Sequence, residues 1–342
     1  MAAQRLTGLP QLTIVFCYAF VGRILLMSYA KAGLAGLVGL VGASIAAAPA
    51  SAQNVVGMGT AQQGATVQYG TAIAKVVSER SGIQMRTQAL SSTNQYAPRV
   101  NAGELEFGIS NMIEANFALK GTGLFEGRPN RNLRMAFTMF PLPITFMVAN
   151  KSGIKSVEQY AGARAPVGWN AQKLGDYIFR GFFANQQAKY ESVRGVPVTA
   201  MPRMWDLFGQ GELDLIFGVL NGATTKELAI KVGGARYISV DDSPAAIERM
   251  QPFLPGSYVT NDKNLENGEM VKNIAFDFVV FTNASVSEDT VYKVVKAAYE
   301  GRQDLKSYSG DWLPKFVDKT ELDYHPGAIK FYKEVGLWVP KK

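Results

Sequence analysis

The 342-residue sequence is short of cysteine and histidine, with Cys17 and His325 the only residues of these types. Thiolate nucleophiles, disulfides and cysteine metal sites therefore have no support, and a Ser-His-Asp triad would depend on one histidine in a Tyr-His-Pro-Gly turn. We expect His325 to begin a helix instead, with Pro326 in its first turn. HExxH, EF-hand and GxxxxGK[ST] patterns are also missing. These absences argue against catalysis, and we predict no catalytic residue, cofactor or metal.

Acidic residues are absent from the first 52 positions, which carry three basic residues. The chain has 35 basic residues, so 32 of them remain after position 52 against 28 acidic residues, without a Lys/Arg cluster. So mild an excess gives little support for a nucleic-acid groove, and no nucleic-acid partner is expected. With 47% apolar and 18% charged residues, the chain can bury substantial cores, and its length suits two domains.

The N-terminal region has the anatomy of a secretory signal peptide. An apolar run over 32–48 follows Lys31 and leads to the small-residue triplet Ala50-Ser51-Ala52. This order predicts that residues 1–52 are removed by cleavage before Gln53.

Translation from Met27 would give a complete signal, so we interpret residues 1–26 as an over-extended start. The alternative is that 1–52 forms two weak membrane helices that anchor the protein. Beyond position 53 no uncharged apolar run approaches the ~20 residues that span a bilayer. An exported chain without a lipid anchor, disulfide or span indicates the bacterial periplasm.

After position 52, short strand patterns alternate with helix patterns, which is typical of parallel sheets covered by helices. In the first half we expect strands and helices alternately at 54–59, 67–81, 83–90, 95–102, 106–110 and 113–120. In the second half we expect them at 164–168, 174–185, 196–201, 204–209, 213–219 and 224–232. The motif Gly103-Glu-Leu-Glu-Phe-Gly108 returns as Gly211-Glu-Leu-Asp-Leu-Ile-Phe-Gly218, which indicates one plan for both halves.

Two long extended segments connect the two halves. One is 135–150, which we expect to be broken at Pro141 and Pro143, and the other is 273–283. We expect them to cross between two lobes. The predicted fold is α/β, with two lobes, each a mostly parallel sheet flanked by helices. The expected parts are lobe 1 at 53–142 plus 250–300, lobe 2 at 143–249, and C-terminal helices packing across the lobes at 301–342. The tail is expected to be helical from Tyr292, with breaks at Gly301, Gly310 and Pro314.

Small polar residues follow several expected strands where the next helix begins. In open parallel sheets such junctions gather at the carboxyl edge, where helix N-termini offer N–H groups to an anion. The candidate ligand-binding residues at these junctions are Thr60, Gln63, Gly64, Ser92, Thr93, Asn94, Ser110, Asn111, Gly168, Trp169, Asn170, Ala171, Gln172, Asn221 and Gly222.

Each junction also has a purely structural reading. Its Ser, Thr or Asn can serve only as the N-cap of its own helix. Trp169 can close a pocket over a ligand or pack under a helix, and the sequence leaves both open. Arg99 can pair with a ligand carboxylate, although one turn into a helix it is more often a solvated surface residue.

Three strings add a resemblance to a known family: Tyr69–Lys75, Ala102–Ile109 and His325–Gly336. With the junctions, they resemble the TAXI family of TRAP-transporter solute receptors over nearly all of 53–337, and the C-terminal string is the most specific. The resemblance implies a monomeric periplasmic receptor of type II-like fold, hinged by its crossing strands. It implies capture of a small organic acid and delivery to integral-membrane TRAP permease subunits driven by an ion gradient. Glutamate-like and 2-oxoacid ligands are known in the family.

The sequence departs from this family at two loops. Gln62–Gln68 stands where the family has a glycine-rich loop followed by Tyr-Tyr-Pro, so an aromatic wall of the pocket is missing or supplied by Tyr69. Trp169-Asn170 replaces a small Gly/Ser loop. The expected ligand is therefore a small organic anion, a carboxylate or an amino acid, without the family's own ligand carried over.

The alternative function is a periplasmic sensor or enzyme domain on the same two-lobed fold. An enzyme needs a proton-transfer group in the cleft. We expect none at the carboxyl edge, because the Asp and Glu residues considered stand at strand starts.

Overall fold

The computed structural model describes residues 54–62, 64–306 and 313–338. The chain divides into two units, Met1–Ala50 and Ser51–Lys342, and every described residue belongs to the second. The predicted signal peptide, its cleavage site and Gln63 lie outside the described residues.

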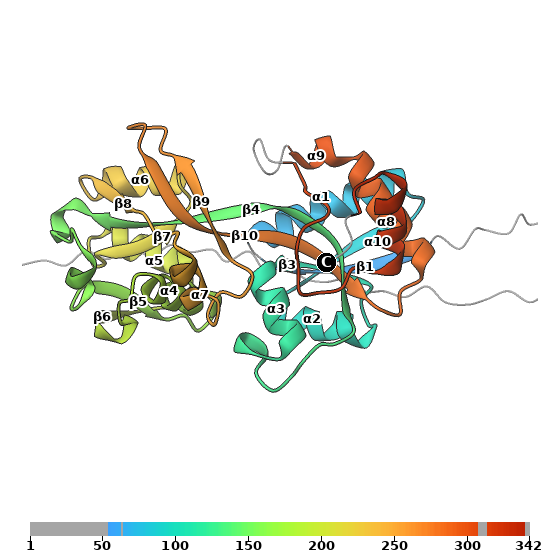
Figure 1. Ribbon diagram of the computed structural model, residues 1–342, viewed down its shortest axis with the longest axis horizontal. Helices are drawn as coiled ribbons and strands as arrows, with labels where there is room; N and C mark the ends of the chain where they lie inside the picture. Colours follow the sequence, from blue (N-terminus) through green and yellow to red (C-terminus); the bar gives the residue numbers. More distant parts are fainter. Residues whose placement is uncertain (1–53, 63, 307–312, 339–342) are drawn as a thin grey trace, which may run out of the picture. The chain divides into compact units, whose positions relative to one another are not determined.

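The second unit alternates strands and helices along the chain (Figure 1). The strands are β1 (Val55–Ala61), β2 (Gln84–Leu90), β3 (Phe107–Asn111), β4 (Leu133–Ala149), β5 (Arg164–Gly168), β6 (Arg194–Val198), β7 (Leu215–Gly218), β8 (Ala235–Ile238), β9 (Tyr258–Lys263) and β10 (Met270–Asn283). The helices are α1 (Ala65–Arg80), α2 (Thr93–Ala102), α3 (Met112–Lys120), α4 (Leu174–Asn185), α5 (Met201–Gly209), α6 (Ala223–Lys231), α7 (Pro244–Met250), α8 (Glu288–Glu300), α9 (Arg302–Lys306) and α10 (Pro326–Glu334).

One large mixed sheet runs through the described residues in the order β2-β1-β3-β10-β4-β7, with β8 also paired to β4 and β9 to β10. β1 is parallel to both β2 and β3, and the separate pair β5-β6 is parallel too. The antiparallel pairs all involve the long strands β4 and β10. Parallel strands followed by covering helices confirm the predicted α/β class.

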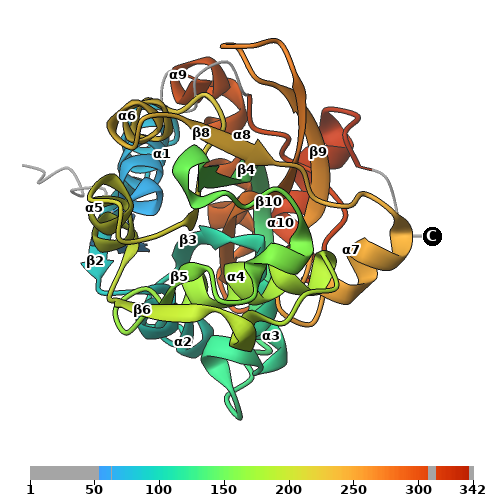
Figure 2. The ribbon, with the colours of Figure 1, turned by 90° about the vertical axis from the view of Figure 1, so that its left-hand side faces the viewer.

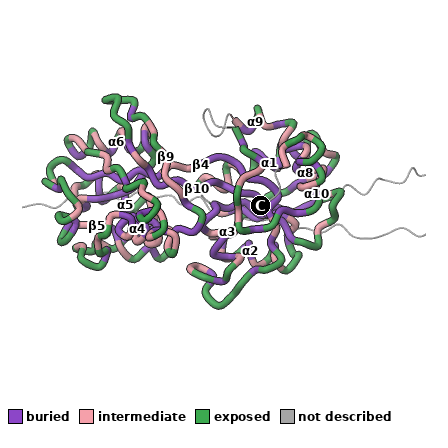
Figure 3. The backbone as a smooth tube through the Cα atoms, in the orientation of Figure 1, coloured by how far each residue is buried: buried purple, intermediate pink, exposed green. Residues whose placement is uncertain are grey.

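The long strands β4 and β10 link the β1–β3 group to the β7–β9 group (Figure 1). Both are buried along most of their length (Figure 3). The expected break of β4 at Pro141 and Pro143 is wrong, since both prolines pair in register with β10. Over these positions β10 is the partner strand of β4, and β7 and β8 begin to pair only at Thr145 and Phe146. A proline fits where one edge of a strand has no neighbour to receive its missing N–H.

Helices pack in pairs around these strands. In the second half α4 packs with α7 and α5 with α6 (Figure 2), and in the first half α8 packs between α1 and α10. The Tyr332 hydroxyl of α10 is buried and donates to the Ala136 carbonyl of β4 over 2.6 Å. His325 caps α10 as predicted, because its Nδ1 accepts the Gly327 N–H.

The repeated motif takes the same local structure in both halves. Gly103 and Gly211 follow α2 and α5 with φ of 79° and 78°, the left-handed region that glycine adopts without strain. The next Leu of each copy, Leu105 and Leu213, is buried, and β3 or β7 follows. The echo in the sequence therefore records a shared helix-turn-strand unit.

Two expected element boundaries are wrong. β6 ends at Val198 and α5 already begins at Met201, because Pro202 suits the first turn of a helix. The tail is not helical over 313–325. There Phe316 and Tyr324 form bridges to Thr138 and Met135 of β4, so backbone pairing with a strand replaces the helix.

Candidate ligand-binding site

The carboxyl ends of β1, β2 and β3 meet at one edge of the sheet. Met58 pairs with Phe107, and Ala61 pairs with Leu90. The helices that follow these strands begin beside this edge, with Gly64, Ser92 and Asn111 as the N-caps of α1, α2 and α3. The structure thus brings the first-half candidates together, with Gln63 outside the described residues.

The Glu114 carboxylate joins three of these candidates. Its Oε2 accepts hydrogen bonds from Thr93 Oγ1 at 2.9 Å, Ser110 Oγ at 3.3 Å and Asn111 Nδ2 at 2.7 Å. The Glu114 N–H in turn donates to Asn111 Oδ1 at 3.0 Å. All three donor residues are buried, so Glu114 ties α2, β3 and α3 into one polar cluster.

Glu114 is a residue that the sequence reasoning missed. It contradicts the expectation that no proton-transfer group lies at the carboxyl edge. Burial raises the pKa of its carboxyl group, and the bonds from Thr93, Ser110 and Asn111 oppose that shift only in part. The Asn-x-x-Glu spacing from Asn111 resembles a capping box and could have indicated it. The N-terminus of α3 is consequently filled by a carboxylate of the chain itself.

Thr60 and Tyr69 lie on the α1 side of the same edge. Thr60 is fully buried, and its Oγ1 has no hydrogen-bond partner among the described residues. α1 approaches it closely at Gly70, where an added Cβ would lie 2.5 Å from Thr60 Cγ2. The Tyr69 ring centroid lies 4.7 Å from that of Phe140 in β4 and 5.2 Å from that of Phe278 in β10. Tyr69 therefore joins α1 to both long strands.

Asn94 and Ser92 interact mainly with each other at the start of α2. The Ser92 hydroxyl donates to Asn94 Oδ1, and both side chains are partly exposed. Arg99 is exposed, with its Nε 3.9 Å from Glu104 Oε2. This agrees with the surface reading of Arg99.

Gly168, the last residue of β5, and Trp169, which follows it, have positive φ values of 99° and 47°. A positive φ strains the backbone of a bulky residue. It persists only where the surrounding packing holds the residue in place. Trp169 is fully buried, and its ring stacks on Phe217 with centroids 5.8 Å apart. An added Cβ at Gly175 would lie 2.2 Å from the Trp169 ring. These contacts favour the packing interpretation of Trp169.

The three residues after Trp169 differ in their exposure and contacts. Asn170 and Ala171 are exposed. Gln172 Oε1 accepts the Met201 N–H over 2.8 Å and so caps α5. Asn170 is consequently the freest polar side chain of this loop.

Asn221 and Gly222 follow β7, at the start of α6. Asn221 has a φ of 62°. Its Nδ2 donates to the Lys263 carbonyl at 2.9 Å, and its Oδ1 accepts the Leu265 N–H at 2.8 Å. Both ends of this amide hold the segment between β9 and β10, which accounts for Asn221 without a ligand.

A cavity of about 510 Å³ opens beside Trp169, between α4 and the β5-β6 pair. Its walls include Gly168, Trp169, Lys173, Tyr177 and Tyr190. Trp169 Nε1 is buried without a partner at hydrogen-bond geometry in the described part of the chain. Such a cavity offers aromatic surface beside the Lys173 ammonium group, and its wall also holds Arg180 paired with Asp176 and Glu191. Its volume falls in the range of small-molecule sites.

Comparison with known proteins identifies the family of this chain. A model of the NMT1-like family matches residues 58–336. The chain belongs to the NMT1-like family.

Solved structures of two other proteins resemble the NMT1-like chain. PhnD1 from Prochlorococcus marinus, in complex with methylphosphonate, matches with a TM-score of 0.52 and 7% identity over 84% of this chain and 100% of that one. MatC from Rhodopseudomonas palustris, with bound malate, matches with a TM-score of 0.50 and 12% identity over 75% of this chain and 88% of that one. These likenesses confirm the predicted two-lobed α/β binding-protein fold.

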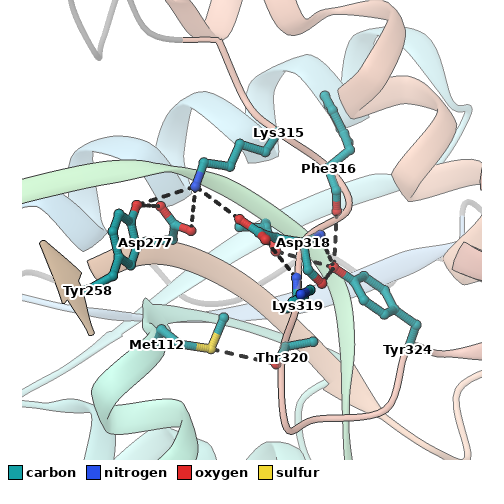
Figure 4. Close-up of polar contacts among 10 residues, drawn as sticks. Met112, Tyr258, Asp277, Lys315, Phe316, Asp318, Lys319, Thr320 and Tyr324 are labelled. Carbon is teal, nitrogen blue, oxygen red and sulfur yellow. Dashed lines mark hydrogen bonds and ion pairs between the residues drawn. The ribbon is translucent and has the colours of Figure 1, made fainter. Parts of the chain in front are cut away.

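A second polar cluster in this NMT1-like chain lies where β10, β9 and the C-terminal segment meet (Figure 4). Asp277 Oδ1 accepts the Tyr258 hydroxyl at 2.8 Å, and Lys315 Nζ donates to Asp277 Oδ2 at 2.9 Å and to Asp318 Oδ2 at 3.0 Å. Burial alone would lower the pKa of Lys315, but its bonds to Asp277 and Asp318 raise it. The sequence reasoning did not single out these residues.

Neither metal-ligand clusters nor membrane-spanning helices occur in the part of the chain that the structure describes. Within 54–62, 64–306 and 313–338, no three His, Cys, Asp or Glu side chains are placed to share a metal ion. No helix in these ranges combines the length and apolar character that crossing a bilayer requires.

Proposed function

We propose that this chain is an extracytoplasmic solute receptor that captures a small organic acid anion and delivers it to a TRAP-type secondary transporter. The observation that supports this most is the shared carboxyl edge of β1, β2 and β3, where polar residues and helix N-termini meet. Similar edges bind ligands in open α/β sheets. The structural neighbours PhnD1 and MatC hold methylphosphonate and malate, which are small organic anions.

We propose that the ligand lies between two lobes, one built around β1–β3 and the other around β5–β9. The N-termini of α1, α2 and α4 carry no side-chain cap, so their N–H groups and dipoles are available to a carboxylate. Lys173, at the N-cap of α4, adds a positive charge at the cavity beside Trp169. The anionic end of the ligand is expected there, because Glu114 already fills the N-terminus of α3.

A thermal-shift screen tests ligand capture. Binding to the folded state alone adds roughly 2.7 kcal/mol of stability at a ligand concentration one hundred times Kd, which raises Tm by several degrees. At least one mono- or dicarboxylate, 2-oxoacid or acidic amino acid should give this shift with protein that was unfolded and refolded to remove carried-over ligand. Silence of all these acids together with stabilisation by sugars or cationic amino acids would contradict the proposal.

Delivery and export have their own tests. We propose that residues 1–52 act as a signal peptide, so mass analysis of the periplasmic fraction should find a mature N-terminus at Gln53, and a chain begun at Met27 should be exported equally. We also propose a monomer that works with integral-membrane permease subunits. Loss of the gene for this chain should then abolish uptake of the ligand found in the screen. For the signal peptide, intact residues 1–52 on exported protein would refute the proposed cleavage.

A further inference from the structure

Glu114 uses one carboxylate oxygen inside the protein and leaves the other available. Oε2 takes all three side-chain donors, whereas Oε1 has no hydrogen bond in the described structure. The residue is partly exposed, and Oε1, although it has no partner, is not a fully buried atom. Oε1 is therefore not sealed off from solvent at the carboxyl edge.

The neighbouring hydroxyl and amide groups are not placed to donate hydrogen bonds to an anion here. Thr93, Ser110 and Asn111 each direct a donor to Glu114 Oε2, and each is at most 5% exposed. What a ligand meets at this point is a hydrogen-bond acceptor. A ligand carboxylate or carbonyl oxygen would face Oε1 without a proton between them, which is unfavourable in a desolvated site.

Building on the proposed function, we propose that Glu114 determines specificity by accepting a hydrogen bond from the ligand. The receptor then selects organic acids that also carry a hydroxyl or amino group over their 2-oxo and unsubstituted analogues. Hydroxyl and ammonium groups share the donor that Oε1 needs, whereas a carbonyl oxygen or a methylene group offers none.

Glu114→Gln inverts this selection rather than only weakening it. The three donors to Oε2 require an acceptor at that position, so the amide oxygen of Gln stays there. The amide NH2 then takes the place of Oε1 and presents a donor. The variant should prefer the 2-oxo analogue, which offers an acceptor.

The experiment measures Kd for matched acids that differ only at C2: succinate, malate, oxaloacetate and aspartate, and the corresponding three- and five-carbon sets. In each set that binds wild type, the hydroxy or amino acid should bind about ten- to a hundredfold more tightly than the 2-oxo acid, as expected for a hydrogen bond to a charged group. Glu114→Gln should reverse the order. Glu104→Gln, on the exposed surface near Arg99, should keep the wild-type order.

The pH dependence of wild type gives a second measurement that needs no variant. Burial raises the pKa of Glu114, and proton uptake turns its acceptor into a donor, so the preference for the hydroxy acid should shrink as the pH falls through that raised pKa. Tyr96, whose hydroxyl lies 3.1 Å from Thr93 Oγ1, is the other titratable group at this cluster. It stays neutral here because burial and the Glu114 charge raise its pKa.

The outcomes separate the two proposals. Equal binding of hydroxy and 2-oxo acids by wild type, or an unchanged order in folded Glu114→Gln, would overturn the role of Glu114 and leave the organic-acid receptor standing. Failure of every acid to bind wild type would overturn the receptor proposal itself, and the inference with it.

Discussion

Lys315 and Asp277 form an ion pair whose acidic partner is almost fully buried. The Nζ–Oδ2 distance is 2.9 Å, and only 5% of the Asp277 side chain is exposed. Asp277 pairs with Pro141 of β4 just before a register shift in β10, and Lys315 comes from the segment that follows α9. The pair thus fastens the C-terminal segment to β10 where its ladder with β4 is irregular.

Lys315→Met should destabilise the protein by about 2 kcal/mol, between the values for exposed and fully buried pairs, because it leaves the Asp277 carboxylate without its counter-charge. Lys272→Met is the matched control. Lys272 lies in β10 itself and pairs with Asp242, but their side chains are 39% and 54% exposed, so its loss should cost at most ~1 kcal/mol. Urea unfolding measures both changes.

The double variant Lys315→Met with Asp277→Asn should recover part of this loss, because it removes both charges together. The Asn oxygen can still accept the Tyr258 hydroxyl bond. Simple addition of the two single losses would show that the charges do not interact.

The close contact between Gly175 and Trp169 predicts a coupled pair of variants. Gly175→Ala should destabilise the wild type, because the new Cβ would lie 2.2 Å from a ring that is fully buried. Trp169→Ala alone should cost ~3–5 kcal/mol through lost packing. In the Trp169→Ala background, Gly175→Ala should instead be neutral or stabilising by up to ~1 kcal/mol, because Ala favours helices.

A thermal melt of the four proteins completes this cycle. If Gly175→Ala were equally costly with and without Trp169, the ring would not be the obstacle. Weakened ligand binding in Trp169→Ala without lost stability would favour the pocket-closing reading of Trp169.

Asn221 and Asn170 should respond differently to replacement. Asn221→Gly keeps the left-handed backbone but loses two hydrogen bonds, at a cost of about 1–2 kcal/mol, and Asn221→Ala should cost about 1 kcal/mol more through its positive φ. Neither should alter ligand affinity. Asn170→Ala, at an exposed position, should change stability by less than ~0.5 kcal/mol. Calorimetry with a ligand from the screen tests this contrast, and an affinity loss in folded Asn221→Gly would contradict it.

Local sequence patterns predicted most of the helices and strands. β5 and α4 were predicted at their observed bounds, Arg164–Gly168 and Leu174–Asn185, because strand and helix periodicity, glycine stops and caps are all encoded within a few residues. Prolines were harder to interpret. Pro141 continues β4, and Pro202 starts α5, and which effect a proline has depends on its neighbours in space.

The sequence predicts that polar strand-to-helix junctions meet, but not the contacts that their side chains make. The junctions after β1, β2 and β3 do meet at one edge, since the parallel pairing of these strands requires it. Glu114 depends on Thr93, 21 positions away, Asn221 on Lys263, 42 positions away, and Lys315 on Asp277, 38 positions away. Contacts over such separations leave no periodic signal. Only the Asn111-x-x-Glu114 spacing, whose contacts span three positions, could have indicated that a carboxylate fills the start of α3.

His325 should make stability fall in mild acid. It is 1% exposed, and burial lowers its pKa, with Glu288 opposing and Arg134 supporting that shift. A lowered pKa in the folded state contributes stability that is present above the unfolded value of ~6.5 and is lost as pH falls through the folded value, at about 1.4 kcal/mol per pH unit.

His325→Asn keeps a capping oxygen for Gly327 and removes the titration. Urea unfolding from about pH 7.5 to about pH 5 should therefore show wild type losing stability relative to the variant, since all other titrations are common to both. Parallel stability curves would mean that His325 is protonated equally in the folded and unfolded states.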